Sequence, residues 1–305
     1  MRDVVSTRKP IPPAPSGIYG LAHPAVAPNL HGLTILHVAD LHVRRWNVRS
    51  SGWKRIEKAC AFPVDLVVVT GDLMDHPRDE HRAAHLLSRL TEMFNVRLGT
   101  FGIFGNHDTS RGREVLRRVP GIRWLGCDEP GGCAVGISVQ AGIIEPGQDA
   151  TPDLILGGDH YPADVLAVKL AVDRLESKLN SAQASISIPT AHQRPMRVLL
   201  AHYPTRVFAA SSLGFDLVLA GHTHGGQIRP LPGMVAHASC DIPNQYATGI
   251  IRVSETLCAI TRGIGEGHLP VRFLCPRQLP IYSLSQGWMR AQSSHTHTIE
   301  QIGYW

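Results

Sequence analysis

Residues 33–42 read Leu-Thr-Ile-Leu-His-Val-Ala-Asp-Leu-His, a short apolar run that ends in an acid and a histidine. Runs of four to eight mainly apolar residues are typical of strands buried on both faces of a sheet, so residues 33–38 predict such a strand. Asp40 and His42 follow at the point where this strand would end. The same arrangement recurs along the chain, and the recurrence indicates both the fold and the site.

Four further apolar runs have the same character, at residues 66–70, 101–104, 198–201 and 217–220. Polar residues come directly after every run. The five clusters are Asp40-Leu41-His42, Gly71-Asp72, Gly105-Asn106-His107-Asp108, His202 and Gly221-His222-Thr223-His224. Ligand sites in open α/β sheets lie beyond the carboxyl ends of the strands, where groups far apart in sequence converge. We therefore expect the five clusters to share one crevice.

Helix-like segments separate the strands, at residues 53–61, 77–94 and 163–180. Strands that alternate with helices predict an α/β fold. The final third of the chain differs, because its short strand-like runs are separated by glycine and proline instead of helices. These runs are residues 257–261, 271–274 and 281–284. We expect a second, largely antiparallel sheet in this part of the chain.

The composition is that of an ordinary globular protein, with 305 residues of which 43% are hydrophobic and 18% charged. We expect one domain at residues 32–285, preceded by an extended proline-rich arm at residues 1–31 and followed by a polar tail at residues 286–305. The net charge of +5 favours anionic partners without choosing among phosphates, nucleic acids and acidic lipids.

Two kinds of apolar segment are missing from the sequence. It contains neither the apolar core of a secretory signal nor a run of about 18 apolar residues that could cross a membrane. We therefore expect a cytoplasmic protein, with peripheral association with a membrane left open. A disulfide between Cys127 and Cys133 is geometrically possible, but large chains rarely need such a link, so free thiols are the prediction.

The polar clusters have the chemistry of a metal site. Aspartate, histidine and asparagine without cysteine suit divalent ions such as Mn, Fe or Zn. Each cluster alone has an ordinary structural explanation, but five in the same context do not. The number of side chains exceeds what one tetrahedral zinc ion would take, so the sequence predicts two metal ions.

In their order and spacing the clusters resemble the signature of the calcineurin-like metallophosphoesterases, D-x-H, G-D-x-x-D, G-N-H-[DE], H and G-H-x-H. The resemblance implies that family's α/β fold of two packed mixed β-sheets flanked by helices. It also implies the ligands of both ions: Asp40, His42 and His224 for one, Asn106, His202 and His222 for the other, and Asp72 between them. In such a site, ions about 3.5 to 4 Å apart clamp the phosphoryl oxygens and activate a bridging hydroxide for in-line attack.

Two further residues acquire catalytic roles from the resemblance. His107 would protonate or stabilise the leaving oxygen, a task that suits histidine because its pKa lies near neutrality. Asp75 matches the carboxylate that would orient this imidazole. Arg44, Arg45 and Trp46 follow the first cluster and could reach a substrate.

The stretch 221–227, Gly-His-Thr-His-Gly-Gly-Gln, resembles a bacterial subgroup that includes membrane-associated phosphodiesterases and UDP-2,3-diacylglucosamine diphosphatases. Gly225 and Gly226 have two explanations of equal weight. Residues without Cβ could let the backbone approach metal and phosphate closely, or they could simply make a turn.

Three functions compete on this sequence. The leading hypothesis is hydrolysis of a phosphodiester or diphosphate in a lipid-linked or nucleotide-sugar substrate. A nuclease or cyclic-nucleotide phosphodiesterase would use the same centre, but no strip of aromatic and basic residues predicts a nucleic-acid partner. A metal-binding scaffold without catalysis is disfavoured because His107 and Asp75 are present.

Overall fold

The computed structural model describes residues 17–303 apart from 45–58, 61, 131, 145–147, 149, 163, 184–193, 232, 233, 236, 239, 268, 290–292 and 295–298. Most of the predicted helix at residues 53–61, together with Arg45 and Trp46, lies outside the described residues. No helix in the described ranges is long and apolar enough to cross a membrane.

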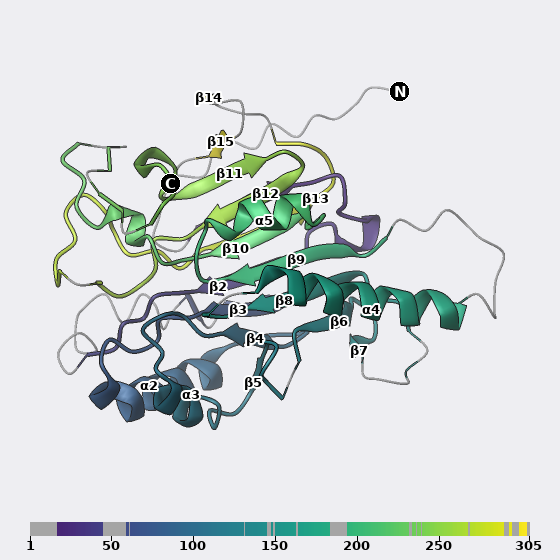
Figure 1. Cartoon of the computed structure of the whole chain (residues 1–305), viewed down its shortest axis with the longest axis horizontal. Helices are drawn as coiled ribbons and strands as arrows, with labels where there is room; N and C mark the ends of the chain where they lie inside the picture. The colour runs from purple at the N-terminus through teal and green to yellow at the C-terminus, as the bar shows by residue number, and fades with distance from the viewer. Residues whose placement is uncertain are drawn as a thin grey trace.

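Two mixed sheets pack face to face and are flanked by helices (Figure 1). The first has the order β1 (Ile18–Ala22), β13 (Ile281–Ser285), β2 (Thr34–Val38), β3 (Leu66–Thr70), β4 (Thr100–Ile103) and β5 (Ile122–Trp124). The second has the order β14 (Ser293–Ser294), β15 (Glu300–Gly303), β11 (Gly249–Val253), β12 (Thr256–Ile260), β10 (Leu217–Ala220), β9 (Met196–Ala201), β8 (Leu154–Asp159), β6 (Ala134–Ser138) and β7 (Gly142–Ile144). The expected α/β fold is confirmed.

The central strands are buried on both faces, as their continuous apolar sequences predict. In β3, Leu66 and Val68 face the core between the two sheets, while Val67 and Val69 face a second core under the helices. This alternation follows from the two-residue period of a strand. Strands β2, β3, β4 and β5 run parallel, and so do β8, β9, β10 and β12, so their carboxyl ends point the same way within each sheet.

Helices cover the outer faces of both sheets. On the first sheet lie the short helix η3 (Pro77–Asp79), α2 (Glu80–Met93) and α3 (Ser110–Leu116). Pro77 fits the first turn of η3 because its missing N–H needs no partner there. On the second lie α4 (Val165–Gln183) and α5 (Arg206–Ser212), with Val168 and Val172 of α4 in the core. The predicted helices at 77–94 and 163–180 are confirmed.

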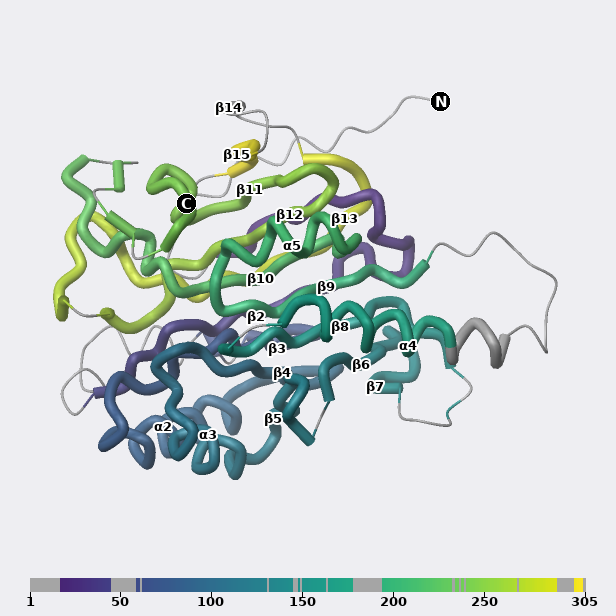
Figure 2. The backbone as a smooth tube through the Cα atoms, viewed as in Figure 1, coloured from purple at the N-terminus to yellow at the C-terminus, as the bar shows by residue number. Residues whose placement is uncertain are grey.

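Both ends of the expected domain were placed wrongly. Strand β1 lies within the proposed arm, yet it pairs with β13 over five residues and Leu21 is buried. Strand β15 lies within the proposed tail, yet it pairs with β11 and buries Ile302. In Figure 2 the purple N-terminal tube accordingly runs beside green and yellow segments from the C-terminal third. Tertiary pairing, not local composition, holds these short strands in the sheets.

Three other expectations change. Residues 271–274 form no strand, only an isolated bridge between Phe273 and Ile228. The final third makes no separate sheet, because β12 joins the second sheet and β13 the first. Cys127 and Cys133 form a disulfide, with their Cα atoms 4.7 Å apart. The main-chain N–H of Gly126 donates to the oxygen of Gly132 at 3.0 Å, which closes this small loop and brings the two cysteines together.

Candidate metal centre

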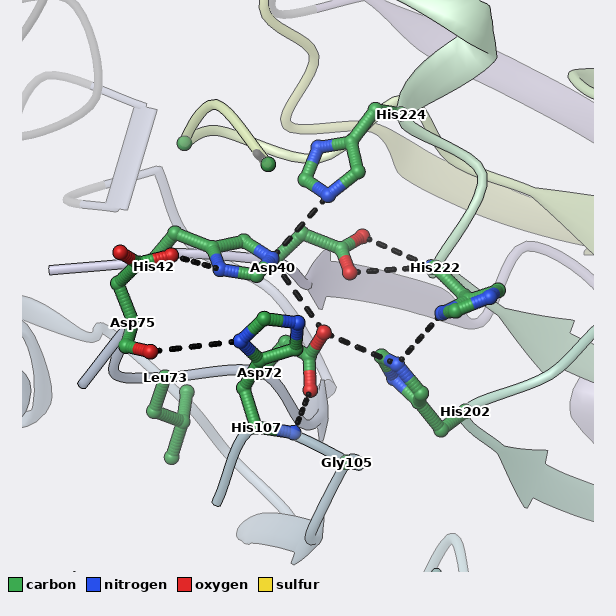
Figure 3. Close-up of polar contacts among 12 residues, drawn as sticks. Asp40, His42, Asp72, Leu73, Asp75, Gly105, His107, His202, His222 and His224 are labelled. Carbon is green, nitrogen blue, oxygen red and sulfur yellow. Dashed lines mark hydrogen bonds and ion pairs between the residues drawn. The ribbon is translucent and has the colours of Figure 1, made fainter. Parts of the chain in front are cut away.

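The polar clusters from all five strand ends meet at one place (Figure 3). The carboxyl ends of β2, β3 and β4 supply residues from the first sheet, and those of β9 and β10 supply residues from the second. The site therefore lies where the edges of the two sheets come together. The predicted convergence is confirmed in the positions of the side chains.

The backbone that carries these side chains is strained. Eight described non-glycine residues have positive φ, and five of them are predicted ligands. These five are Asp40, His42, Asp72, His222 and His224. Such conformations cost about 1–3 kcal/mol each and persist only where the surrounding structure imposes them. Strain concentrated in this way is typical of a functional site.

Glycines before the ligands let the loops approach one another. A Cβ on Gly105 would lie 2.2 Å from Oδ1 of Asp72, and a Cβ on Gly221 would lie 2.5 Å from Oδ2 of Asp40. No larger residue fits at either position without moving a carboxylate. The glycines in the G-N-H-D and G-H-x-H elements are therefore required by packing.

Asp72 lies between two groups of histidines. Its Oδ2 is 3.3 Å from Nε2 of His42 and 3.2 Å from Nε2 of His202. On the first side, Nε2 of His224 is 3.1 Å from Nε2 of His42. On the other, Nδ1 of His222 is 3.1 Å from Nε2 of His202. Asp72 therefore lies between the pair His42 and His224 and the pair His202 and His222.

The donor set fits divalent metal ions. Two groups of three side chains each bring a ligand atom within 4.8 Å of the others: Asp40, His42 and His224, and Asp72, His202 and His222. Asn106 adds a second indication, because its Oδ1 is buried and has no hydrogen-bond partner among the described residues. A buried acceptor without a partner requires an explanation, and a cation supplies one.

Charge inside the centre favours cations. Burial lowers the pKa of His42, but Asp72, Asp75 and Asp40 outweigh it and raise that pKa to about 10. Burial likewise lowers the pKa of His202, and Asp72 more than reverses this, to about 9. Although burial alone would raise the pKa of Asp72, the two histidines hold it well below its usual range. The carboxylates therefore attract positive charge, whether protons or metal ions.

His107 lies beside this group and lines the adjoining cavity. Its Nδ1 is 3.4 Å from the main-chain oxygen of Asp75, not from the carboxylate that was expected to orient it. The carboxylate of Asp75 instead contacts Nδ1 of His42 at 3.4 Å and Nε of Arg44 at 2.8 Å. Arg44 is therefore held by Asp75 and by the main-chain oxygen of Gly267.

Sequence reasoning missed the residue that anchors the loops. The buried carboxylate of Asp108 accepts hydrogen bonds from the main-chain N–H groups of Asp72, Leu73 and Gly105 at 2.8 to 2.9 Å. Asp108 is the last residue of the G-N-H-D element. The motif therefore pointed to this residue, but it did not indicate that the carboxylate binds main-chain N–H groups.

A second missed residue is Arg272, which comes from the C-terminal third. Its guanidinium donates to the main-chain oxygens of His224 and Arg262, at 3.3 and 2.8 Å. It thereby fixes the loop that carries His224. The sequence gives no sign of this contact because the two residues lie 48 positions apart.

A cavity of about 390 Å³ opens beside the centre. Its lining includes predicted ligands, His107, Gln227, Ile228, His237 and Leu269. The two glycines before Gln227 have positive φ, and a Cβ on Gly226 would lie 2.3 Å from Cγ1 of Val235. Both make a turn whose packing excludes a side chain, so the turn explanation accounts for them.

Comparison with known proteins gives consistent matches. The sequence model of calcineurin-like phosphoesterases matches residues 33–226. The metallophosphoesterase YkoQ of Bacillus subtilis is 27% identical over 241 residues, covering 79% of each chain. The metallophosphoesterase Cj0846 of Campylobacter jejuni is 28% identical, covering 84% of this chain and 60% of its own. A Danio rerio protein named "Transmembrane protein with metallophosphoesterase domain" is 27% identical, covering 88% and 60%.

Proposed function

The chain belongs to the calcineurin-like phosphoesterase family and is a metal-dependent phosphoric ester hydrolase. On this basis we propose that it cleaves a phosphodiester or diphosphate bond in a substrate with an apolar, lipid-linked part. The observation that carries the proposal is the convergence of carboxylates and imidazoles around Asp72, next to a cavity whose lining includes the apolar side chains of Ile228 and Leu269.

In this proposal Asp40, His42 and His224 hold one divalent ion, Asn106, His202 and His222 hold another, and Asp72 contacts both. When bound, two such ions polarise the phosphoryl oxygens and lower the pKa of a water molecule to provide the nucleophile. Mn, Fe and Zn all suit this donor set. The protein contributes the strained loops that keep the ligands in position before substrate arrives.

His107 supplies the proton for the leaving oxygen. A carbonyl oxygen can only accept, so the contact with the main-chain oxygen of Asp75 places a hydrogen on Nδ1 of His107. In the charged imidazole the second proton is on Nε2, which is the atom that would donate it to the leaving group. Asp75 acts on His107 through its main chain and on His42 through its carboxylate.

The cavity lining supports a diester or diphosphate over a monoester. Among the described residues that line it, none is arginine or lysine. A phosphate monoester carries two charges at the reacting phosphorus and gains from such cations, whereas a diester carries one. The same lining contains no phenylalanine, tyrosine or tryptophan on which the bases of a nucleic acid could stack.

Two observations support the lipid-linked part. Ile228 and Leu269 contribute apolar side chains to the cavity lining. In addition, relatives of the chain are named as transmembrane proteins, which associates this domain with membranes in those proteins. We propose accordingly that the protein acts at a membrane surface.

A hydrolysis screen tests the proposed function. The purified full chain would be freed of metal, loaded separately with Mn, Fe or Zn, and given monoesters, simple diesters, cyclic nucleotides, single-stranded DNA and diphosphate-linked lipids. We expect turnover of diesters and diphosphates, fastest with the lipid-linked compounds. Activity confined to monoesters or to DNA would contradict the proposal.

A further inference from the structure

Two loops contribute Gly226, Gln227, Ile228, Gly267 and Leu269 to the lining of the cavity. We name them the mouth loops, and their described residues are 226–231, 234 and 235 in the first and 267 and 269–275 in the second. They run side by side, with the main-chain N–H of Phe273 donating to the oxygen of Gln227 at 2.9 Å. The Gln227 side chain fastens them further, since its Nε2 donates to the main-chain oxygens of Leu269 and Val271 at 2.7 and 3.2 Å. The mouth loops therefore behave as one structural unit (left in Figure 1).

Among the described residues, the mouth loops carry most of the large hydrophobic side chains that are more than half exposed. Seven large hydrophobic side chains in the described residues are more than half exposed, and six of them lie on these loops. The six are Leu231, Met234, Leu269, Val271, Phe273 and Leu274. The seventh is Leu166 on α4. Exposed apolar side chains are common singly, but a contiguous group marks a surface that binds something.

The charge of the mouth loops is compatible with a lipid surface. Residues 225–240 and 267–278 contain no aspartate or glutamate, but they contain Arg229, Arg272 and Arg277. No carboxylate on these segments would therefore oppose anionic lipid headgroups. The three arginines have partners within the protein, because Arg229 and Arg272 donate to main-chain oxygens and Arg277 pairs with Glu266, so apolar contacts carry the binding.

We propose that the mouth loops insert their apolar side chains into the interface of a lipid bilayer, so that the cavity opens directly onto lipid headgroups. Leu269 belongs both to the exposed group and to the cavity wall, so the apolar surface continues into the site. A second protein copy seated on this surface would close the cavity, whereas a bilayer would deliver substrate through it. This inference rests on the proposed function, because only a lipid-linked substrate would need to enter the cavity from a bilayer.

Vesicle binding tests the proposal without measuring catalysis. The full chain would be sedimented with phosphatidylcholine vesicles containing phosphatidylglycerol. We expect it to sediment with the vesicles and to remain bound at high salt, since apolar contacts are not screened. The double variant Leu231→Ser/Leu274→Ser should bind about tenfold or more weakly, because two leucine side chains lose their burial in lipid.

The matched control is Leu166→Ser/Leu170→Ser, which removes two comparably exposed leucines from α4, at 57% and 48% exposure. It should bind vesicles like the unaltered chain. Neither double variant should change hydrolysis of a soluble diester such as bis(4-nitrophenyl) phosphate, which reports on the fold and the metal centre.

Three results would overturn the inference: no sedimentation of the unaltered chain, equal loss in both double variants, or a dimer in solution that Leu231→Ser/Leu274→Ser abolishes. A chain that binds vesicles through the mouth loops but hydrolyses no lipid-linked compound would refute the proposed function and support the membrane surface. A chain that hydrolyses such compounds in detergent but does not bind vesicles would support the proposed function and refute the membrane surface.

Discussion

The carboxylate of Asp108 accepts a hydrogen bond of 2.9 Å from the main-chain N–H of Asp72, the residue between the two groups of predicted ligands. The same carboxylate accepts from Leu73 and Gly105, so one buried side chain joins the ends of β3 and β4. Burial raises its pKa to about 6, so keeping this carboxylate charged here carries a free-energy cost.

Replacing Asp108 should therefore damage the centre without removing a ligand. In Asp108→Asn an amide NH2 group replaces one carboxylate oxygen, and this group cannot accept from a main-chain N–H. We expect metal affinity and activity to fall roughly 10- to 100-fold, as for other residues that support metal ligands. Metal titration and thermal unfolding of the same sample separate this loss from unfolding. Unchanged metal affinity would contradict the role.

His107 should matter to turnover and not to metal content. The variant His107→Asn removes the proton donor, and we expect kcat to fall about 10²- to 10⁴-fold. The loss should be smallest with nitrophenyl esters, whose leaving group needs no proton. His81→Asn is the control, because that side chain is exposed on α2. An equal loss with good and poor leaving groups would argue against proton transfer by His107.

Metal binding should release protons. Without bound metal, the pKa values of His42 and His202 are raised to about 10 and about 9, so both rings are charged at about pH 7.5. A ring nitrogen binds metal only after losing its proton, so apparent affinity should rise as pH rises toward about 9. Calorimetric titration with Mn²⁺ in two buffers of different ionisation enthalpy measures this release. Heats that do not depend on the buffer would contradict it.

The turn at Gly226 offers a stability test with a matched control. Gly226 and Gly142 both have φ of +79°, but a Cβ on Gly226 would lie 2.3 Å from Val235, whereas Gly142 faces open space. Gly142→Ala should cost about 1 kcal/mol from backbone strain alone. Gly226→Ala should cost about 1 to 3 kcal/mol more, from overpacking. Denaturant unfolding compares the two, and equal losses would show that no clash occurs.

The sequence predicted the parts of the fold that local pattern determines. We could predict the five buried strands and the polar clusters after them, such as Leu66–Thr70 followed by Asp72. A strand that is buried on both faces has a continuous apolar sequence, which is easily recognised. Helix α2 could be predicted from the length of its segment and from Pro77 near the start of that segment.

What the sequence did not reveal depends on contacts between distant segments. Strand β1 gains its place by pairing with β13, about 260 positions away, and the prolines on both sides of it, such as Pro15 and Pro24, made the segment resemble an extended arm. Residues 271–274 misled because apolar residues normally indicate burial, whereas here Val271, Phe273 and Leu274 are exposed. The partner of the Asp75 carboxylate could not be predicted either, because a motif gives residue types and not side-chain directions.

The number and place of the metal ions is the most direct test of the centre. Crystals of the full chain soaked in Mn²⁺ would be measured at the manganese absorption edge, where anomalous scattering locates each ion. We predict two peaks, one bound by Asp40, His42 and His224, the other by Asn106, His202 and His222, with Asp72 contacting both. A single peak, or peaks at the other acidic cluster of Asp128, Glu129 and His160, would contradict it.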